Sequence, residues 1–328
     1  MEPSPSSYPL DEQQSKLYER VLLRTIEGSS FIRVLNLHHA SKHAPLPGTL
    51  EAVDLSQNPV PCFNALSYVW GQNRSPEDRI ICNGHDLTIT ASCHDALQAL
   101  REKHGNITIW VDAICINQKD ENEKAIQVPL MQLIYLKAKS VYIWLGHGNK
   151  VYQHGLEVVR AAASIYVIEH AVIVMKRISL SWTWHMLRYI TTFPQSWLRL
   201  ARNLKSLERV AKQEGSSMDQ MNFDCEWLHR AWTFQEFMLA ENPVFLCGTT
   251  EVSMSEMNGM FYYRSPMWKT WIGALSFKKA FSGDNSTTTK ASINLWIDVL
   301  TQWYQMRILY MRQEPEPRRK INAKVSIP

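Results

Sequence analysis

The sequence predicts an α/β fold: a mostly parallel sheet with a β-hairpin, a helical insertion and a helical C-terminal region. The first observation is that apolar, β-branched runs alternate along the chain with amphipathic helical segments, which is the pattern of βαβ units. The second is the stretch 109–123, where an apolar run turns abruptly polar at Asn117 and then opens an amphipathic helix. Ligands commonly bind at the loops that leave the C-terminal ends of parallel strands, so Asp112, Asn117 and Gln118 are candidate site residues.

The composition is that of an ordinary globular protein. Its 328 residues are 45% hydrophobic and 20% charged, and a net charge of +4 is too small to indicate nucleic-acid binding. Because the first residues lack the basic and then apolar pattern of a signal peptide, we expect a cytoplasmic protein. The six cysteines fall singly, without a CxxC pair, and we interpret them as reduced, mostly buried thiols.

The chain opens with a leader, residues 1–30, of which residues 1–15 are rich in Pro and Ser and are predicted to be disordered. Residues 31–37 alternate loosely and predict a first strand. The loop that follows carries three histidines, but no second pair of ligands stands at a matching spacing. We therefore interpret it as a solvated loop and predict no metal site.

A second strand is predicted at 65–70, where Gly71 stops the run. Asn83-Gly84 lies between two β-type runs and predicts a type I′ hairpin, because both central residues of that turn need positive φ. Ser92 is the predicted cap of the next helix. The apolar face of that helix is expected to consist of Ala96, Leu97 and Leu100.

A helix is predicted within 120–139, but Pro129 lies inside its pattern. Proline removes a backbone hydrogen bond and crowds the preceding turn, so we expect the helix to begin near Val128 or to be kinked. Its apolar face is predicted to consist of Ile126, Leu130, Met131, Ile134, Tyr135 and Ala138. The strand that follows, 140–145, ends in Gly146-His147-Gly148, which indicates a tight turn more than a phosphate-binding loop.

Residues 150–222 are predicted to be a helical insertion. Its segment 161–175 is apolar but shorter than the roughly 20 residues of a membrane span, so a buried helix is favoured. Segment 176–214 carries eight Lys or Arg against two Asp or Glu. A basic amphipathic helix of this kind can bind a membrane surface or an acidic partner, or can pack on its own domain with a solvated face.

The remaining elements are a helix at 227–240, a strand at 244–247, a helix over 293–308 and an unstructured tail from 313. The domain is therefore predicted at 31–250, with core motifs within 62–240, and residues 251–328 form a helical extension with a disordered tail.

Several segments form one ordered set of motifs. The longest are Ala65–Gly71 (ALSYVWG), Trp110–Gln118 (WVDAICINQ) and Arg230–Glu236 (RAWTFQE). Shorter ones are Asn83-Gly84, Gln127-Val128, Met131, Tyr135, Trp144–Gly146 and Leu239-Ala240. Together they resemble the fungal heterokaryon incompatibility (HET) domain. The resemblance implies a cytosolic module that triggers growth arrest or cell death when genetically different fungal cells fuse. Lys124 and Pro129 depart from the family pattern, and the chain ends where relatives would continue, as in a short family member or a truncated gene.

A second, more distant resemblance is to the Toll/interleukin-receptor (TIR) domain, a flavodoxin-like fold. The order of strands and helices is similar, and Trp232 precedes Glu236 by four residues, as in the Trp-x-x-x-Glu pattern of TIR domains. In some TIR domains that glutamate cleaves NAD at the bond between nicotinamide and ribose. The resemblance implies NAD as a substrate and Glu236 as the catalytic carboxylate.

The predicted site therefore joins a catalytic candidate, Glu236, to binding candidates that are expected to line one cleft. A carboxylate near the ribose suits the oxocarbenium-like state of glycosidic cleavage. The binding candidates are Trp70, Gly71, Asp112, Asn117, Gln118, Gly146 and Trp232.

Structural roles remain open for each of these residues. Trp232 could be a core residue, Asp112 could anchor its loop, and Glu236 could pair with Arg230. The sequence contains no GxSxG, HExxH or GxxxxGK[ST] motif. The competing function is a non-enzymatic module that acts by self-association or by binding a partner protein.

Overall fold

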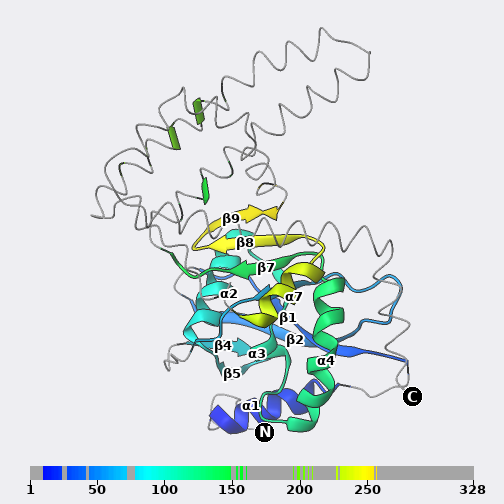
Figure 1. Cartoon of the computed structure of the whole chain (residues 1–328). Coiled ribbons are helices and arrows are strands. Elements are labelled where there is room, and N and C mark those ends of the chain that lie inside the picture. Colours follow the sequence, from blue (N-terminus) through cyan, green and yellow to red (C-terminus); the bar gives the residue numbers. More distant parts are fainter. Residues whose placement is uncertain are drawn as a thin grey trace. The chain divides into compact units, whose positions relative to one another are not determined.

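The computed structural model divides the chain into two units, and every element labelled in Figure 1 except β9 belongs to the first. The first comprises residues 1–147, 226–249 and 306–328, and the second comprises residues 148–225 and 250–305. Every motif discussed below belongs to the first unit; the second contains strand β9 (Thr250–Ser253). The described residues are 10–23, 28–41, 44–71, 78–148, 230–254 and the single positions 153, 156, 157, 160, 195, 198, 199, 202, 203, 206, 209, 227 and 256.

The first unit is organised around one mixed sheet, in which the strands lie in the order β5-β4-β2-β1-β6-β3-β7-β8. Strands β6, β3, β7 and β8 run parallel to one another, and so do β2 and β4, whereas β1 is antiparallel to both β2 and β6. The predicted α/β fold is therefore confirmed, with a sheet that is parallel on one side and mixed on the other. The strands are β1 (Phe31–Leu37), β2 (Leu46–Asp54), β3 (Asn64–Ser67), β4 (Arg79–Cys82), β5 (His85–Thr88), β6 (Ile107–Trp110), β7 (Val141–Trp144) and β8 (Pro243–Cys247).

The parallel half forms where the sequence is continuously apolar. Every residue of β7 and β8 is buried, as expected for strands that are covered on both faces. The predicted hairpin is confirmed, because β4 and β5 are antiparallel and Asn83 and Gly84 have φ values of 51° and 81°. These values are those of a type I′ turn.

Helix α2 (Ala91–His104) confirms the predicted apolar face, since Ala96, Leu97 and Leu100 are buried. The predicted cap, Ser92, is wrong. Thr90 caps the helix, and its side chain accepts a hydrogen bond from Cys93 N at 3.3 Å. A cap must precede the first helical residue to reach the free N–H groups, and Ser92 already lies inside the first turn.

The first predicted alternative for helix α4 (Glu121–Lys137), a start near Val128, is wrong, because the helix begins seven residues earlier and continues through Pro129. Asp120 provides the cap, because its Oδ1 accepts from Asn122 N at 2.9 Å and from Glu123 N at 3.1 Å. Pro129 lies inside the helix. Because proline has no backbone N–H, the carbonyl of Ala125 lacks its helical hydrogen bond. Ala125 is exposed, so water can satisfy that carbonyl.

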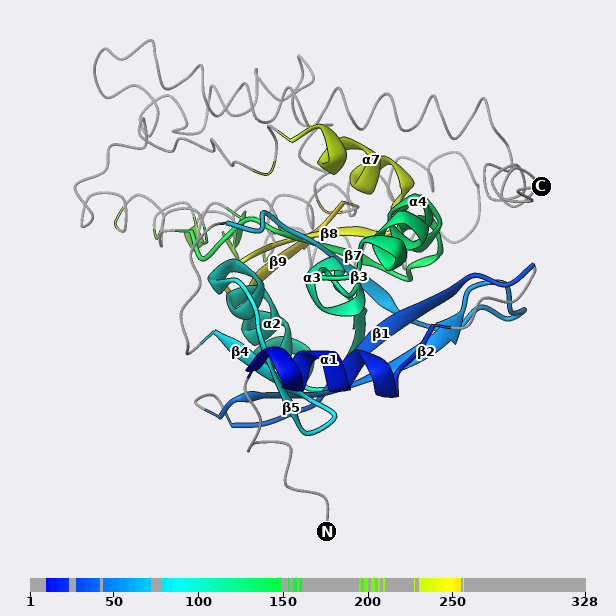
Figure 2. The ribbon, with the colours of Figure 1, turned by 90° about the horizontal axis from the view of Figure 1, so that it is seen from below.

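The predicted apolar face of α4 is only partly correct. Ile134 and Tyr135 are buried, but Ile126 is 58% exposed and its neighbour Val128 is 44% exposed. The buried surface thus lies mainly in the second half of the helix. Helix α7 (Ala231–Leu239), within the predicted helix 227–240, packs beside α4 (Figures 1 and 2).

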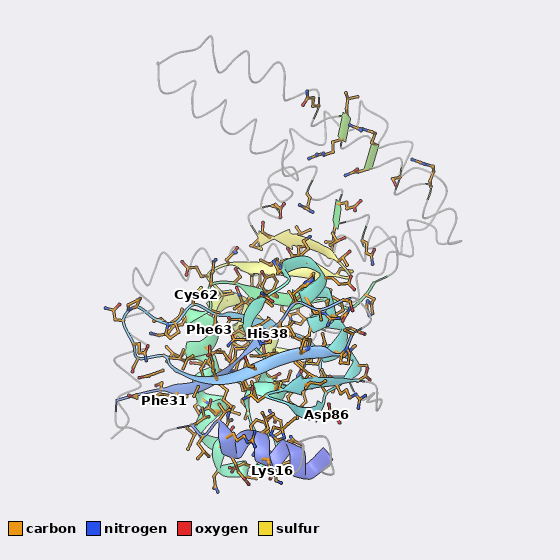
Figure 3. The ribbon with its side chains drawn as sticks, turned by 180° about the vertical axis from the view of Figure 1, so that it is seen from behind. Lys16, Phe31, His38, Cys62, Phe63 and Asp86 are labelled. Carbon is orange, nitrogen blue, oxygen red and sulfur yellow. The ribbon has the colours of Figure 1, made fainter. Side chains whose placement is uncertain are left out.

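The leader contains a helix that the sequence does not suggest. Helix α1 (Leu10–Arg20) includes residues 10–15, for which disorder is the expectation. It packs against β5 (Figure 2). Leu17 and Tyr18 are buried. Figure 3 labels Lys16 and Asp86, which lie on these two elements.

Other predictions fall largely outside the described residues, namely the insertion 150–222 with its basic segment 176–214, the helix at 293–308 and the tail. Among the helices that the structure describes, none is long and apolar enough to cross a membrane. The cysteines in the described part are free thiols, and all but Cys62 are buried, in agreement with the prediction.

A buried ion pair links the leader, the sheet and the loop 111–120 that follows β6, which we call the signature loop. Arg33 on β1 is 1% exposed, and its Nη1 and Nη2 donate to the two carboxylate oxygens of Glu123 at 2.6 and 3.0 Å. Arg33 also donates from Nε to Val21 O at 2.7 Å and from Nη1 to Cys115 O at 3.2 Å. Glu123 in turn accepts from Asn117 N at 2.7 Å. Four segments, namely the leader, β1, the signature loop and α4, thus meet at one bidentate contact.

We predict that Glu123→Gln lowers the free energy of unfolding by about 3 kcal/mol or more, because it leaves the buried Arg33 charge without its counterion. Urea unfolding followed by circular dichroism measures this loss. Glu121→Gln is the matched control, since Glu121 is on the same helical turn but has a side chain that is 84% exposed in its pair with Lys124. We expect the control to lose less than about 1 kcal/mol. Equal losses in the two variants would contradict a special role for the buried pair.

Candidate functional site

The sheet brings the ends of three sequence motifs to one edge. Ser67 is the last residue of β3, Asp112 follows β6 by two residues, and Gly146 follows β7 by two residues. Since β3 is parallel to both β6 and β7, all three strands end on the same side of the sheet. This is the edge at which open α/β sheets commonly bind ligands.

Asp112 opens the short helix α3 (Asp112–Cys115) and is held by two donors. Trp70 Nε1 donates to its Oδ2 at 2.7 Å, and Ala113 N donates to its Oδ1 at 2.7 Å. Burial raises the pKa of the Asp112 carboxyl, while these hydrogen bonds and the charge of Arg230 act in the opposite direction. Trp70 and Asp112, predicted separately, are therefore direct partners.

Glu236 reaches the same edge from α7. The Ser67 hydroxyl donates a hydrogen bond to Glu236 Oε2, and Trp227 Nε1 donates to Ser67 Oγ at 2.7 Å. Burial raises the pKa of Glu236 from 4.5 to about 7, and the charge of Asp112 adds to this. The Ser67 bond, the charge of Arg230 and the Tyr135 hydroxyl oppose the rise. Glu236 and Asp112 are thus two carboxyl groups that influence each other electrostatically.

Arg230 supplies the positive charge of this cluster. It precedes the first residue of α7, and its Nη1 donates to Tyr68 O at 3.1 Å. Its charge lowers the pKa of Asp112 and of Glu236, although no ion pair between Arg230 and either carboxylate occurs in the described part of the chain. The suggested pairing of Glu236 with Arg230 is therefore electrostatic and not a direct contact.

Asn117 and Gln118 stabilise the loop that carries Asp112. Gln118 Nε2 donates to the carbonyl of Asp112 at 2.8 Å, and Asn117 Oδ1 accepts from Lys119 N at 3.2 Å. Both side chains are thus occupied within the loop that carries Asp112. They hold that loop in place, and no described contact joins them to Glu236.

The remaining predicted residues differ in their surroundings. Gly71 and Gly146 have φ values of 66° and 91°, a left-handed conformation that favours glycine where the chain turns away from β3 and β7. Trp232 is 60% exposed, which excludes the interpretation that it is a core residue. It lies one helical turn before Glu236, and residues four apart share a helix face.

Four contributors were not identified from the sequence as site residues: Ser67, Tyr135, Trp227 and Arg230, the last suggested only as a structural partner of Glu236. Ser67 gives the clearest signal in retrospect, because it is a polar residue at the end of an apolar strand that ends at the binding edge. Trp227 and Tyr135 resemble ordinary buried aromatic residues, and both are indeed buried. They belong to the site because the indole N–H of Trp227 donates to Ser67 and the Tyr135 hydroxyl affects the pKa of Glu236.

The chemistry available at this edge is that of carboxylates. In the part of the chain that is described, no group of His, Cys, Asp and Glu side chains is arranged to hold a metal ion. The cluster instead combines two carboxyl groups of raised pKa, one guanidinium group and an exposed indole. A carboxyl group with a pKa of about 7 can accept or release a proton near neutral pH.

We predict that the Glu236 carboxyl makes stability fall as pH rises from about 4.5 to about 7. The native state holds this proton more tightly than the unfolded chain, so the unfolded chain loses it first as pH increases. Above pH 7 both states are ionised and the contribution is constant. Glu236→Gln should therefore gain stability relative to wild type between pH 5 and 7 in urea unfolding. Glu19→Gln, at an exposed glutamate on α1, is the control and should keep the wild-type slope.

Comparison with known proteins identifies the family. A family model described as heterokaryon incompatibility protein (HET) matches residues 63–236, which is more than half of the chain. The chain is also similar to heterokaryon incompatibility protein 6, OR allele, of Neurospora crassa, with 28% identity over 281 residues. That match covers 74% of this chain and 36% of the relative, so the chain spans about a third of the relative's length. No solved structure matches the chain. Because the family model covers more than half of the chain, including strands β3 to β7 and both Asp112 and Glu236, the chain belongs to the heterokaryon incompatibility (HET) family.

Proposed function

We propose that this chain is a cytosolic module of fungal non-self recognition and that it arrests growth or kills the cell by hydrolysing NAD with Glu236. The observation that carries the enzymatic part is the setting of Glu236. Its carboxyl group is held by Ser67, is close enough to Asp112 for their charges to interact, and has a pKa of about 7. The name of the Neurospora crassa relative supports the role in incompatibility.

The strand order supports a flavodoxin-like and TIR-like interpretation of the parallel half. If β3, β6, β7 and β8 are numbered 1 to 4 in chain order, their order across the sheet is 2-1-3-4. This is the beginning of the flavodoxin-like order 2-1-3-4-5, in which the ligand binds beside the first and third strands. Those strands are β3 and β7 here, and Ser67 ends the first of them.

Hydrolysis at this site needs one reacting carboxylate and one water molecule. The bond between ribose C1′ and the nicotinamide nitrogen breaks, and its electron pair leaves with nicotinamide. The ionised Glu236 carboxylate stabilises the positive charge that develops on the ribose. Water then attacks C1′ and passes its proton to Glu236, which gives ADP-ribose and nicotinamide. In this proposal the Asp112 carboxylate accepts hydrogen bonds from the ribose hydroxyl groups.

Trp232 suits the aromatic part of this substrate. Its indole is 60% exposed and lies on the same face of α7 as Glu236, one turn earlier. An exposed indole offers a flat surface on which a nicotinamide or adenine ring can stack. Trp70, by contrast, uses its indole N–H to hold Asp112, so we assign it to positioning that carboxylate.

We predict that Glu236→Gln reduces NAD cleavage by at least about 100-fold, because the uncharged amide cannot stabilise the ribose cation or accept the water proton. Release of nicotinamide from NAD by purified protein, followed by chromatography, measures this. Gln235→Ala is the matched control, since Gln235 is exposed on the neighbouring position of α7, and it should retain activity. Absence of nicotinamide release from folded wild-type protein in every assembly state tested would refute the enzymatic proposal.

A second prediction concerns substrate binding. Trp232→Ala should raise KM for NAD by about tenfold through loss of stacking, while kcat changes little. Trp232→Phe keeps a flat ring and should retain most of the affinity. Steady-state kinetics on the two variants makes the comparison, and a loss of kcat with unchanged KM in Trp232→Ala would contradict the assignment.

A non-enzymatic interaction module is the second candidate, and one observation favours it. Trp232 on α7 and Ile126 and Val128 on α4 are exposed apolar residues on two helices that pack together. Such a surface could bind a second copy of the chain or a partner protein. Expression in fungal cells separates the two functions: growth arrest that survives Glu236→Gln supports the interaction module, whereas growth arrest that disappears, with folding and assembly intact, supports the enzyme.

A further inference from the structure

Ser67 forms hydrogen bonds with Trp227 and Glu236, and the chemistry of these groups determines which of them donates in each bond. The indole N–H of Trp227 can only donate, and it lies 2.7 Å from Ser67 Oγ. Ser67 Oγ therefore accepts from Trp227. A hydroxyl group carries a single proton, so Ser67 has one proton left to donate, and the atom in line for it is Glu236 Oε2.

Burial makes this direction stable. Ser67 is 1% exposed and Trp227 is fully buried, so solvent does not compete for either group. Ser67 is also fixed by the sheet, where it is paired with Ile143 of β7. The Trp227 ring packs edge-on against Phe245 of β8, with ring centroids 6.3 Å apart. Donor and acceptor are thus anchored to neighbouring parts of the parallel sheet.

We propose that Ser67 is a positioning residue, which Trp227 orients so that its hydroxyl proton points at Glu236 Oε2 and leaves Oε1 as the oxygen presented to the substrate. This inference rests on the proposed role of Glu236 and extends it, because it specifies which carboxylate oxygen reacts. Trp227 acts one step further away, through Ser67. Neither residue touches the ribose in this scheme.

The other groups that act on Glu236 come from separate elements, so a change of Ser67 removes none of them. Asp112 belongs to α3, Tyr135 belongs to α4, and Arg230 precedes α7. Asp112 raises the pKa of Glu236, whereas Arg230 and Tyr135 lower it. A change in the titration of Glu236 on removing the Ser67 hydroxyl therefore reports the Ser67 bond.

The test is a carboxyl titration of Glu236 by NMR in full-length protein labelled with ¹³C at the glutamate side-chain carboxyl, with Glu236→Gln to assign the signal. Ser67→Ala should raise the midpoint by about one pH unit or more, because it removes a hydrogen bond that stabilises the ionised form of the carboxylate. Trp227→Phe should raise it less, because the freed hydroxyl can still donate to Glu236 in part of the population. Ser67→Cys, of similar volume and with a weaker donor, should lie between wild type and Ser67→Ala.

Ser140→Ala is the matched control. Ser140 is also buried, and its Oγ accepts from Asn242 Nδ2 at 3.0 Å, away from Glu236. This variant should leave the Glu236 midpoint unchanged. A midpoint in Ser67→Ala or Ser67→Cys that stays at the wild-type value, in folded protein, would overturn the inference.

The pH profile of NAD cleavage gives the second readout. In Ser67→Ala the acidic side of the plot of kcat against pH should shift to higher pH by the same amount as the NMR midpoint. At neutral pH, kcat should fall by a larger factor than KM rises. Loss of activity without this shift to higher pH would indicate a merely structural residue and would overturn the inference. Failure of the proposed function is separate, since wild-type protein would then release no nicotinamide while the NMR midpoint would still respond to Ser67.

Discussion

The buried ion pair between Arg33 and Glu123 is the interaction on which the first unit most depends. Taking two charges out of water is costly, and attraction between them compensates only when their remaining donors and acceptors are also satisfied. Here the guanidinium group also binds the carbonyls of Val21 and Cys115, and the carboxylate also binds Asn117 N. The pair therefore fixes the position of the signature loop relative to the sheet.

The carboxylate cluster depends on that loop, because the loop carries Asp112. Tyr18 on α1 adds a second restraint by donating from its hydroxyl to Ile114 O at 2.9 Å, and Gln118 closes the loop onto the carbonyl of Asp112. Glu236 arrives from a segment 169 residues beyond Ser67 in the chain. The parallel strands are what place these distant segments at one edge, so the site is a product of topology as much as of local sequence.

Sequence reasoning succeeded where one local signal dominated. The continuous apolar runs at β7 and β8 and the Asn83-Gly84 turn each allowed a single interpretation, and each is confirmed. It failed where tertiary contacts decided the outcome. Helix α1 is polar apart from a few residues, and it forms because Leu17 and Tyr18 find a surface to pack on.

The candidate site shows the same division. Strand ends and motifs predict Asp112 and Trp70 as separate site residues, and the structure joins the two side chains by a direct hydrogen bond. Glu236 was named only through resemblance, since nothing in the spacing of the chain links it to Asp112. Ser67 and Trp227 could not be inferred, because their role depends on the direction of two hydrogen bonds between segments 160 residues apart.

The central claim is that this carboxylate edge binds NAD with the ribose at Glu236. A crystal structure of the protein with carba-NAD tests it most directly, because a methylene group replaces the ribose ring oxygen and prevents formation of the oxocarbenium-like state. We expect the ring carbon that corresponds to C1′ beside Glu236 Oε1, the hydroxyl groups at Asp112 and an aromatic ring against Trp232. Binding of carba-NAD elsewhere on the protein, or an empty carboxylate edge at saturating concentration, would contradict the claim.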